Sequence, residues 1–277
     1  MKEEDIRPAG IFQTYLALCE KDIKHFFIHA PTETIACPAC GSQGEFSFSK
    51  HGFSYELCPA CFTLFVSPRP CAAAFDRYYK QSESAKYWAS VFYRETAENR
   101  RKKIWKPKAE LIFEKMNRLN ASAHAMIDIG GGFGIFAQEM EKVSKQSVTV
   151  IEPGPPLAEA CREKGVRVIE KFFHQVNDDE LPGSPRIFVS FELFEHLHDP
   201  GSFLEDIHLH LSEKDLFVFT TLSGQGIDIL TLWDESKSVF PPHHLNFFNP
   251  GAIKGLLENK GFRIIEISTP GRLDVDI

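Results

Sequence analysis

The sequence predicts an α/β protein with a mostly parallel sheet covered by helices on both faces, preceded by a small cysteine-bearing module and a helical connector. Three observations lead to this fold class: strand-like apolar runs alternate with helical stretches from residue 125 onward, four cysteines fall in two close pairs, and a glycine-rich turn follows the first run. The predicted segments are an N-terminal helix in 1–33, the cysteine module in 34–70, the connector in 71–120 and the α/β domain in 121–277.

Composition narrows the class of protein. The 277 residues are 43% hydrophobic and 25% charged, as in soluble globular proteins. The net charge of −7 argues mildly against a large phosphate-binding face, so nucleic acid is a disfavoured partner. The acidic start "MKEEDIRPAG" lacks a secretory apolar region, and no apolar run is long enough to cross a bilayer. We therefore expect a cytoplasmic protein with no membrane partner, and the oligomeric state is left open.

The first helix is predicted over residues 8–28. Pro8 suits a first helical turn, and Ile11, Tyr15 and Leu18 recur at helical spacing. After it, "FSFSKHGFSYELC" has strand character, and its His-Gly pair predicts a hairpin turn.

Four cysteines predict a structural zinc site. Two "CPAC" sequences give the spacing C-x2-C-x17-C-x2-C, which is typical of a zinc ribbon. Four thiolates complete a tetrahedron, so no coordination position remains for catalysis. A pair of disulfides is the alternative, and a reducing compartment disfavours it. The predicted zinc ligands are Cys37, Cys40, Cys58 and Cys61.

The connector is predicted to be helical over residues 72–118. Its basic run "RRKKIWKPK" suits a solvated helix face. Its aromatic stretch, residues 77–93, allows two interpretations: a helix that packs against the domain, or a lid over a bound cofactor. The lid would be lined by Tyr78, Tyr79, Tyr87 and Trp88.

Six strands and four helices are expected in the α/β domain. The strands are "AMIDIG", "SVTVIEP", "VRVIE", "RIFVSFE", "LFVFTTL" and "FRIIEIS", and the helices span 134–144, 157–164, 201–211 and 250–259. This alternation indicates a mostly parallel sheet.

The glycine turn "IDIGGGFGIF" predicts a nucleoside-cofactor site. It follows a strand and opens a helix, and Glu152 ends the next strand, where a carboxylate can accept hydrogen bonds from both ribose hydroxyls. A dinucleotide is disfavoured, because Asp128 would repel a pyrophosphate and the spacing is not G-x-G-x-x-G. A cofactor with an ammonium group and a sulfonium, S-adenosylmethionine, suits the carboxylate; the remaining alternative is a purely structural turn. The predicted binding residues are Asp128, Gly130, Gly132, Gly134 and Glu152.

Four motifs together resemble those of class I S-adenosylmethionine-dependent methyltransferases. They are "IDIGGGFG", "VIEPG", "SFELFEHLHDP" and "PPHHLNFFNPGAIKGLLENKGF", and the branch related to the quinone O-methyltransferases is the most similar. The resemblance covers residues 121–277 and implies a Rossmann-like fold. Two features depart from it: Phe133 is bulkier than the usual Thr or Ser, and the chain stops at "TPGRLDVDI", so a seventh strand is missing or irregular.

The cysteine module resembles the zinc modules that precede some sugar- and polysaccharide-pathway methyltransferases, including nucleotide-sugar C-methyltransferases. Similar modules also precede some ribosomal-RNA methyltransferases, so the resemblance does not choose the acceptor.

"FELFEHLHDP" places acidic and imidazole groups just past the fourth strand. Glu192 is assigned to the cofactor site. Glu195 and His196 either brace the local helix or join Glu192 in a divalent-metal cluster, as a similar E-x-x-E-H in the quinone O-methyltransferase relatives implies. The motif is not D/N-P-P-Y, which base-amine methyltransferases use, and this lowers the expectation of nucleic-acid amine methylation.

"FPPHHLNFF" is expected to overhang the cofactor crevice after the fifth strand. By resemblance to the nucleotide-sugar C-methyltransferases, His244 falls on the family's histidine and His243 replaces its acidic partner. We expect His244 to be a general base or to position the acceptor, with His243 secondary. The alternative is that both histidines only cap or pack.

The sequence therefore predicts a methyltransferase for a small-molecule acceptor, with a sugar or nucleotide-linked sugar favoured and O- or C-methylation both open. Two alternatives remain: an RNA-modifying methyltransferase whose zinc ribbon grips nucleic acid, and a non-catalytic S-adenosylmethionine-binding protein.

Overall fold

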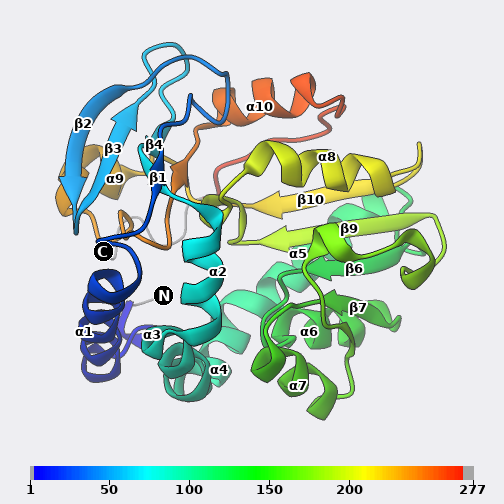
Figure 1. Ribbon diagram of the computed structural model, residues 1–277. Helices are drawn as coiled ribbons and strands as arrows, with labels where there is room; N and C mark the ends of the chain where they lie inside the picture. Colours follow the sequence, from blue (N-terminus) through cyan, green and yellow to red (C-terminus); the bar gives the residue numbers. More distant parts are fainter. Residues whose placement is uncertain (1–2, 271–277) are drawn as a thin grey trace.

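A five-stranded parallel sheet forms the centre of the C-terminal domain in the computed structural model, which describes residues 3–270 (Figure 1). The strand order is β10-β9-β6-β7-β8, and every neighbouring pair is parallel. The strands are β6 (Ala125–Ile129), β7 (Val148–Ile151), β8 (Arg167–Ile169), β9 (Arg186–Phe191) and β10 (Leu216–Thr220). The predicted fold class and five of the six predicted strands are confirmed.

Helices cover both faces of this sheet because successive side chains of its strands point to opposite sides. Met126 packs in one core with α5 and α6, whereas Ile127 packs in another with α8 and α10. The covering helices are α5 (Lys106–Arg118), α6 (Ile135–Ser144), α7 (Pro155–Glu163), α8 (Pro200–His210) and α10 (Pro250–Asn259). Four of them were predicted to within two residues at each end.

The cysteine module folds around a four-stranded antiparallel sheet. Its order is β11-β4-β3-β2, with β2 (Glu45–Lys50), β3 (Phe53–Leu57), β4 (Leu64–Val66) and β11 (Asn246–Phe247). His51 (φ 49°) and Gly52 (φ 86°) form the predicted hairpin turn between β2 and β3. The strand β11 comes from the other end of the chain, which the sequence did not predict. A further pair, β1 (Thr32–Glu33) and β5 (Arg69–Pro70), closes the module.

The N-terminal helix and the connector are helical as predicted. The helix α1 (Ala9–Phe26) lies beside the connector, which is interrupted at Ser82, where the backbone is extended and the side chain caps the next helix. The connector elements are α2 (Ala72–Gln81), α3 (Glu83–Tyr87), the π-helical turn η2 (Trp88–Phe92), α4 (Tyr93–Arg100) and a second π-helical turn, η3 (Arg101–Trp105).

Short elements complete the described chain. They are η1 (Glu3–Asp5), η4 (Phe173–Gln175), η5 (Asp178–Glu180), η6 (Phe194–His196), α9 (Ile227–Leu232) and η7 (Trp233–Glu235). Within residues 3–270, none of the helices combines the length and the apolar character that crossing a bilayer needs.

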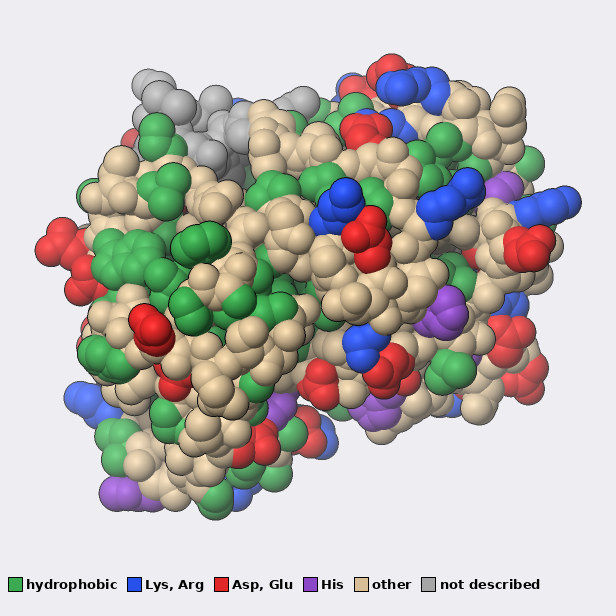
Figure 2. All heavy atoms as spheres, turned by 90° about the horizontal axis from the view of Figure 1, so that it is seen from above, with side chains coloured by type: hydrophobic (Ala, Val, Ile, Leu, Met, Phe, Trp, Pro, Cys, Tyr) green, Lys and Arg blue, Asp and Glu red, His purple; other side chains and the backbone are tan. Residues whose placement is uncertain are grey.

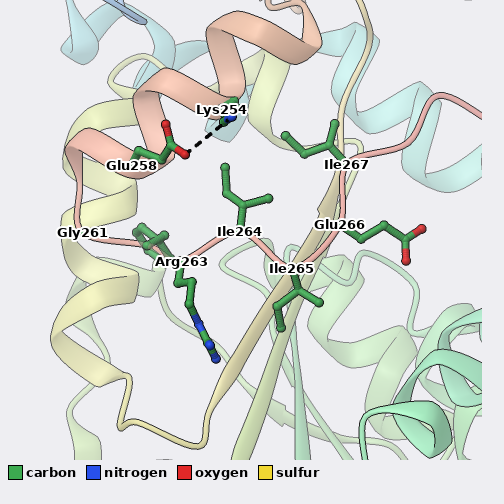
Figure 3. Close-up of a pocket in the computed structure, with 9 residues that line it drawn as sticks. Lys254, Glu258, Gly261, Arg263, Ile264, Ile265, Glu266 and Ile267 are labelled. Atoms are coloured by element: carbon green, nitrogen blue, oxygen red, sulfur yellow. Dashed lines mark ion pairs between the residues drawn. The ribbon is translucent and has the colours of Figure 1, made fainter.

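The predicted strand "FRIIEIS", residues 262–268, is wrong. Phe262 and Ile264 pack against the core beside α8 and α10, but the backbone is not paired with β10. Ile265 and Ile267 remain 54% and 39% exposed. The segment instead borders an open hollow of about 670 Å³, with Lys254 and Glu258 of α10 on its other side (Figure 3). Apolar alternation thus buries one side of this segment without a hydrogen-bonded ladder. Most of the position expected for a seventh strand lies outside the described residues.

Candidate active site

The glycine turn after β6 uses the left-handed backbone conformations that glycine allows. Gly130, Gly132 and Gly134 have φ values of 72°, 54° and 66°. A β-carbon on Gly131 would come within 2.7 Å of the Asp128 carboxylate, and one on Gly134 within 2.9 Å of Cys161 Sγ. At Gly132, by contrast, nothing lies within 4 Å, so the turn is packed underneath and open at Gly132.

Glu152, directly after β7, faces this turn as predicted. Its two carboxylate oxygens accept hydrogen bonds from the backbone nitrogens of Gly132 (3.0 Å) and Gly154 (2.9 Å). The side chain is only 7% exposed, and burial raises the pKa of the carboxyl. Each oxygen keeps a second lone pair, so the carboxylate can still accept from a ribose hydroxyl.

One carboxylate oxygen of Asp128 is buried without a hydrogen-bond partner in the described chain. Its side chain is 2% exposed, and Oδ2 has no hydrogen-bond partner within residues 3–270. Burial, and then the nearby Glu152, raise the pKa of Asp128 to about 7. A cationic or hydrogen-donating ligand in the turn would satisfy this oxygen. The residues therefore fit a ligand with an ammonium group and a ribose, as S-adenosylmethionine has.

Phe133, the bulky residue of the turn, is held by the connector. Its ring stacks on Tyr93 of α4 at a centroid distance of 4.2 Å and an interplanar angle of 13°. The Arg100 guanidinium lies over the Tyr93 ring, and the indole nitrogen of Trp105 donates to the Tyr93 hydroxyl. The connector thus covers the glycine turn at Phe133.

Glu192 lies at the end of β9 in a strained backbone conformation, with φ at 53°. Thr220 Oγ1 donates to its carboxylate at 2.6 Å, and Lys108 Nζ lies 3.4 Å from the same oxygen. The Lys108 ammonium also lies 4.6 Å from the centre of the Phe191 ring. Glu192 is thus at the predicted edge of the sheet, but α5 already supplies it with a cation.

Glu195, His196 and His244 meet at the same edge of the sheet. One ligand-type atom from each lies within 4.8 Å of the other two, so these three residues, and not Glu192, form the group that could hold a second cation. Thr221 Oγ1 donates to Glu195 Oε2 at 2.9 Å. Glu195 is 1% exposed, and burial together with Glu192 raises its pKa to about 8. Burial lowers the pKa of His196 to about 4.

The loop around His244 fixes the protonation of its ring. Nδ1 lies 2.5 Å from the carbonyl oxygen of Ser238, which only accepts, so Nδ1 carries the hydrogen. Burial holds the pKa of His244 well below its usual value, so the ring is neutral. Nε2 therefore bears a lone pair and can accept a proton, but the lowered pKa makes His244 a weaker base than a free imidazole.

His243 faces the N-terminal helix and the connector instead. Its Nε2 lies 2.9 Å from the hydroxyls of both Tyr15 and Tyr78. Burial lowers the pKa of His243 to about 3, so the ring that makes these contacts is neutral. Trp88 packs on Tyr15 at 4.8 Å, whereas Tyr79 is 44% exposed. Of the expected lid residues, Tyr78 thus contacts His243, Trp88 packs on Tyr15 beside it, and Tyr79 is exposed.

The four predicted zinc ligands come together in the cysteine module. Their sulfur atoms lie within 4.8 Å of one another, the Cys37–Cys61 and Cys40–Cys58 sulfurs are 3.5 Å apart, and all four thiols are free. Sulfurs about 2.3 Å from a tetrahedral ion would lie about 3.8 Å from one another. The two cysteine turns share one hydrogen-bond pattern, in which Gly41 donates to Cys37 and Phe62 to Cys58. The set fits a closed zinc site.

Sequence reasoning missed several residues of the site. They are Tyr15, Tyr55, Arg69, Tyr93, Lys108 and Thr221. Tyr15 stood on the apolar stripe of the first helix and Arg69 in "SPRP", but neither pattern reveals a partner far away in the sequence.

Similarity to known proteins agrees with this geometry. A family model described as a methyltransferase domain matches residues 96–267, more than half of the chain. No curated protein matches the sequence. The structure of the plantazolicin methyltransferase BamL, in complex with a triazolic desmethylPZN analog and SAH, is similar with a TM-score of 0.51, 15% identity and coverage of 67% of this chain and 70% of that one. Its counterpart BpumL, bound to SAH, has a TM-score of 0.50, 12% identity and coverage of 66% and 72%. At these identities the likeness establishes the fold.

Proposed function

The chain belongs to the methyltransferase-domain family, and on that premise we propose that it transfers the methyl group of S-adenosylmethionine to a small-molecule acceptor, with a sugar or nucleotide-linked sugar favoured. The observation that carries the proposal is the group of His244, whose Nδ1 hydrogen is fixed by Ser238, with Glu195 and His196 at the carboxyl edge of the sheet. Ligands of parallel α/β sheets bind at this edge.

The glycine turn supports the methyl donor. Asp128 offers an unmet acceptor for the ammonium group, Gly132 lies open, and Glu152 offers its remaining lone pairs to the ribose hydroxyls. Bound S-adenosylmethionine supplies an electrophilic methyl carbon on a sulfonium whose thioether leaves as a neutral group. The protein therefore needs no acid for the leaving group.

His244 supplies the proton acceptor. Its Nε2 would take the proton of an acceptor hydroxyl or carbon acid while the nucleophile attacks the methyl carbon and the carbon–sulfur bond breaks. Ser238 holds the Nδ1 hydrogen throughout, so the ring needs no tautomer change before it accepts. The covering helices α1 and α2, which hold His243 through Tyr15 and Tyr78, would exclude water from the acceptor.

The cysteine quartet would hold a structural zinc ion. All four positions of a tetrahedral ion would be filled by thiolates, which leaves none for an acceptor or a water. The ion would hold together a module whose sheet has only short strands.

The charges of the module favour a small acceptor over RNA. Residues 34–70 hold two basic side chains, Lys50 and Arg69, and two acidic ones, Glu45 and Glu56. Arg69 is fully buried, and Lys50 Nζ donates to the carbonyl oxygen of Ser236. On the face seen from above, Lys and Arg side chains stand among Asp and Glu and form no single basic patch (Figure 2). A ribbon that grips nucleic acid needs a basic surface.

Labelling separates the candidate functions. The protein is incubated with methyl-labelled S-adenosylmethionine and, in parallel, with a small-molecule fraction and an RNA fraction of cell extract. Label in the small-molecule fraction supports the proposal. Label in RNA supports the alternative acceptor, and tight S-adenosylmethionine binding with no label in any fraction indicates a non-catalytic binding protein.

A further inference from the structure

The cysteine module is built into the loop that carries His244. Two residues after this histidine, β11 begins as the fourth strand of the module's own sheet, with Asn246 opposite Phe65 and Phe247 opposite Leu64. The backbone nitrogen of Val66 donates to the carbonyl oxygen of Leu245 at 2.9 Å. The end of the His244 loop therefore takes its position from β4.

One arginine of the module joins both segments of the site. Arg69 is fully buried, and its Nη1 donates to the carbonyl oxygen of His198 at 2.6 Å. Its Nη2 donates to Asn246 Oδ1 at 3.0 Å, and its Nε to the carbonyl oxygen of Val66 at 3.1 Å. His198 lies two residues after His196, and Asn246 lies two residues after His244. A single rigid guanidinium thus links the two segments that carry the site histidines.

Further hydrogen bonds surround this link. Tyr55, in β3 of the module, donates its hydroxyl hydrogen to the carbonyl oxygen of His244 at 2.9 Å. Asn246 Nδ2 donates to the carbonyl oxygen of Leu197 at 2.7 Å. The backbone nitrogen of Leu245 donates to the carbonyl oxygen of Glu195 at 2.9 Å. Both segments are therefore held at backbone atoms within two residues of a site side chain.

The choice of arginine is informative because burying its charge is unfavourable. Burial lowers the pKa of Arg69 to about 10, although the charges of Glu33 and Asp199 oppose this shift. An apolar side chain of similar volume would fill the space without desolvating a cation. Arginine adds donors in fixed directions, and here they bind one carbonyl in the module, one in the Glu195–His198 segment and the amide of Asn246.

We propose that Arg69 and Tyr55 are positioning residues for His196 and His244. The cysteine module would then help to position the catalytic site and would not serve only to recognise a substrate. The proposal rests on the proposed function of His244. One of the cysteine turns also contacts the chain after β11, since Asn249 Nδ2 donates to the carbonyl oxygen of Cys61 at 2.7 Å.

Tyr55→Phe tests the proposal with the smallest change. It removes one hydroxyl and keeps the ring in the core. We expect methyl transfer to slow about five- to tenfold, the effect of one lost hydrogen bond. Bound zinc and S-adenosylmethionine affinity should be unchanged, and the ¹⁵N signals of the His244 ring should shift. Ser49→Ala, which removes an exposed hydrogen bond to Ser54 in the same module, is the matched control and should leave rate and signals unchanged.

Arg69→Lys provides a second test, because one ammonium cannot reproduce the fork of donors. It should slow transfer more than Tyr55→Phe and shift the signals of both His196 and His244. Wild-type rates and unshifted histidine signals in both variants would overturn the proposal. Loss of zinc or of donor affinity in step with the rate would also overturn it, because the role would then be general stability. A wild-type protein that transfers no methyl group would instead contradict the proposed function, and the histidine signals would still test the positioning.

Discussion

His244 Nδ1 lies 2.5 Å from the carbonyl oxygen of Ser238, six residues earlier in the same loop. The sequence had suggested that His244 lacks the acidic partner that would orient it, because His243 occupies that place. The structure shows another solution, in which a backbone carbonyl fixes the tautomer while His243 turns away toward Tyr15 and Tyr78. A carbonyl orients the ring as a carboxylate would, but without raising its pKa through a full negative charge.

Replacing Glu152 by alanine should weaken S-adenosylmethionine binding by about 1.5–3 kcal/mol, the range for hydrogen bonds to a charged group. The variant loses the ribose acceptor and also frees the backbone nitrogens of Gly132 and Gly154. Calorimetry measures the affinity. Glu170→Ala, which removes an exposed carboxylate after the next strand, is the control. Equal affinities in the Glu152 variant and the wild type would rule out this role.

One zinc ion per chain should co-purify with the protein, held by the four-cysteine set. Cys40→Ser should abolish the stoichiometric zinc and lower the melting temperature, because the module would lose its closed site. Cys71→Ser, outside the quartet, should keep both at wild-type values. Elemental analysis of freshly purified, reduced protein decides the matter. Zinc-free wild type, or a disulfide within the quartet, would be incompatible with the assignment.

His243→Gln should affect stability more than catalysis. The ring is hydrogen-bonded to the hydroxyls of Tyr15 and Tyr78, so its loss should destabilise the folded protein by about 1–3 kcal/mol. Turnover should fall by less than about tenfold, because His243 does not face the proposed acceptor. Urea unfolding and steady-state rates measure the two effects. A variant of normal stability with a hundredfold lower rate would give His243 a direct catalytic role instead.

The contribution of Glu195 to stability should fall as pH rises toward 8. Glu195 has a folded pKa of about 8, above its unfolded value, so its contribution is fully present at low pH and is lost as pH rises through 8. The contribution of Asp128 to stability is likewise lost as pH rises through about 7, its folded pKa. His196 has a folded pKa of about 4 and opposes both groups only below about pH 6.5, where the unfolded histidine gains its proton.

Glu195→Gln isolates this effect, since a neutral amide can still accept from Thr221. The decline in unfolding free energy above pH 6.5 should become smaller by up to about 1.4 kcal/mol per pH unit. Chemical unfolding at a series of pH values measures the slope. A slope identical to that of the wild type would mean that Glu195 is ionised in the folded protein.

Much of the architecture could be predicted from local pattern. Five strands, the hairpin at His51–Gly52 and the cysteine set depend on periodicity, turn chemistry and ligand spacing, which are properties of short stretches. The glycine turn and Glu152 were predictable for the same reason, because a strand, a turn and the end of the next strand are close in sequence. The strand "FRIIEIS" failed because pairing depends on a neighbour as well as on pattern.

The site around His244 could not be predicted in this way. Arg69 reaches Asn246 across 177 residues and Tyr55 reaches His244 across 189. These contacts depend on where the module packs, and nothing within either segment specifies the other. The ligands of a second metal site could not be predicted for the same reason. The motif E-x-x-E-H suggested Glu192 as a ligand, but the structure pairs Glu192 with Lys108. It groups Glu195 and His196 with His244 instead.

The most direct test of the account is the methyl-transfer rate of His244→Gln, measured beside its affinity for S-adenosylmethionine. Glutamine keeps a donor near Ser238 but cannot accept a proton, so the rate should fall by about 10²–10⁴-fold while donor affinity stays at the wild-type value. A rate near that of the wild type, with donor binding intact, would contradict the account and leave His244 a packing residue.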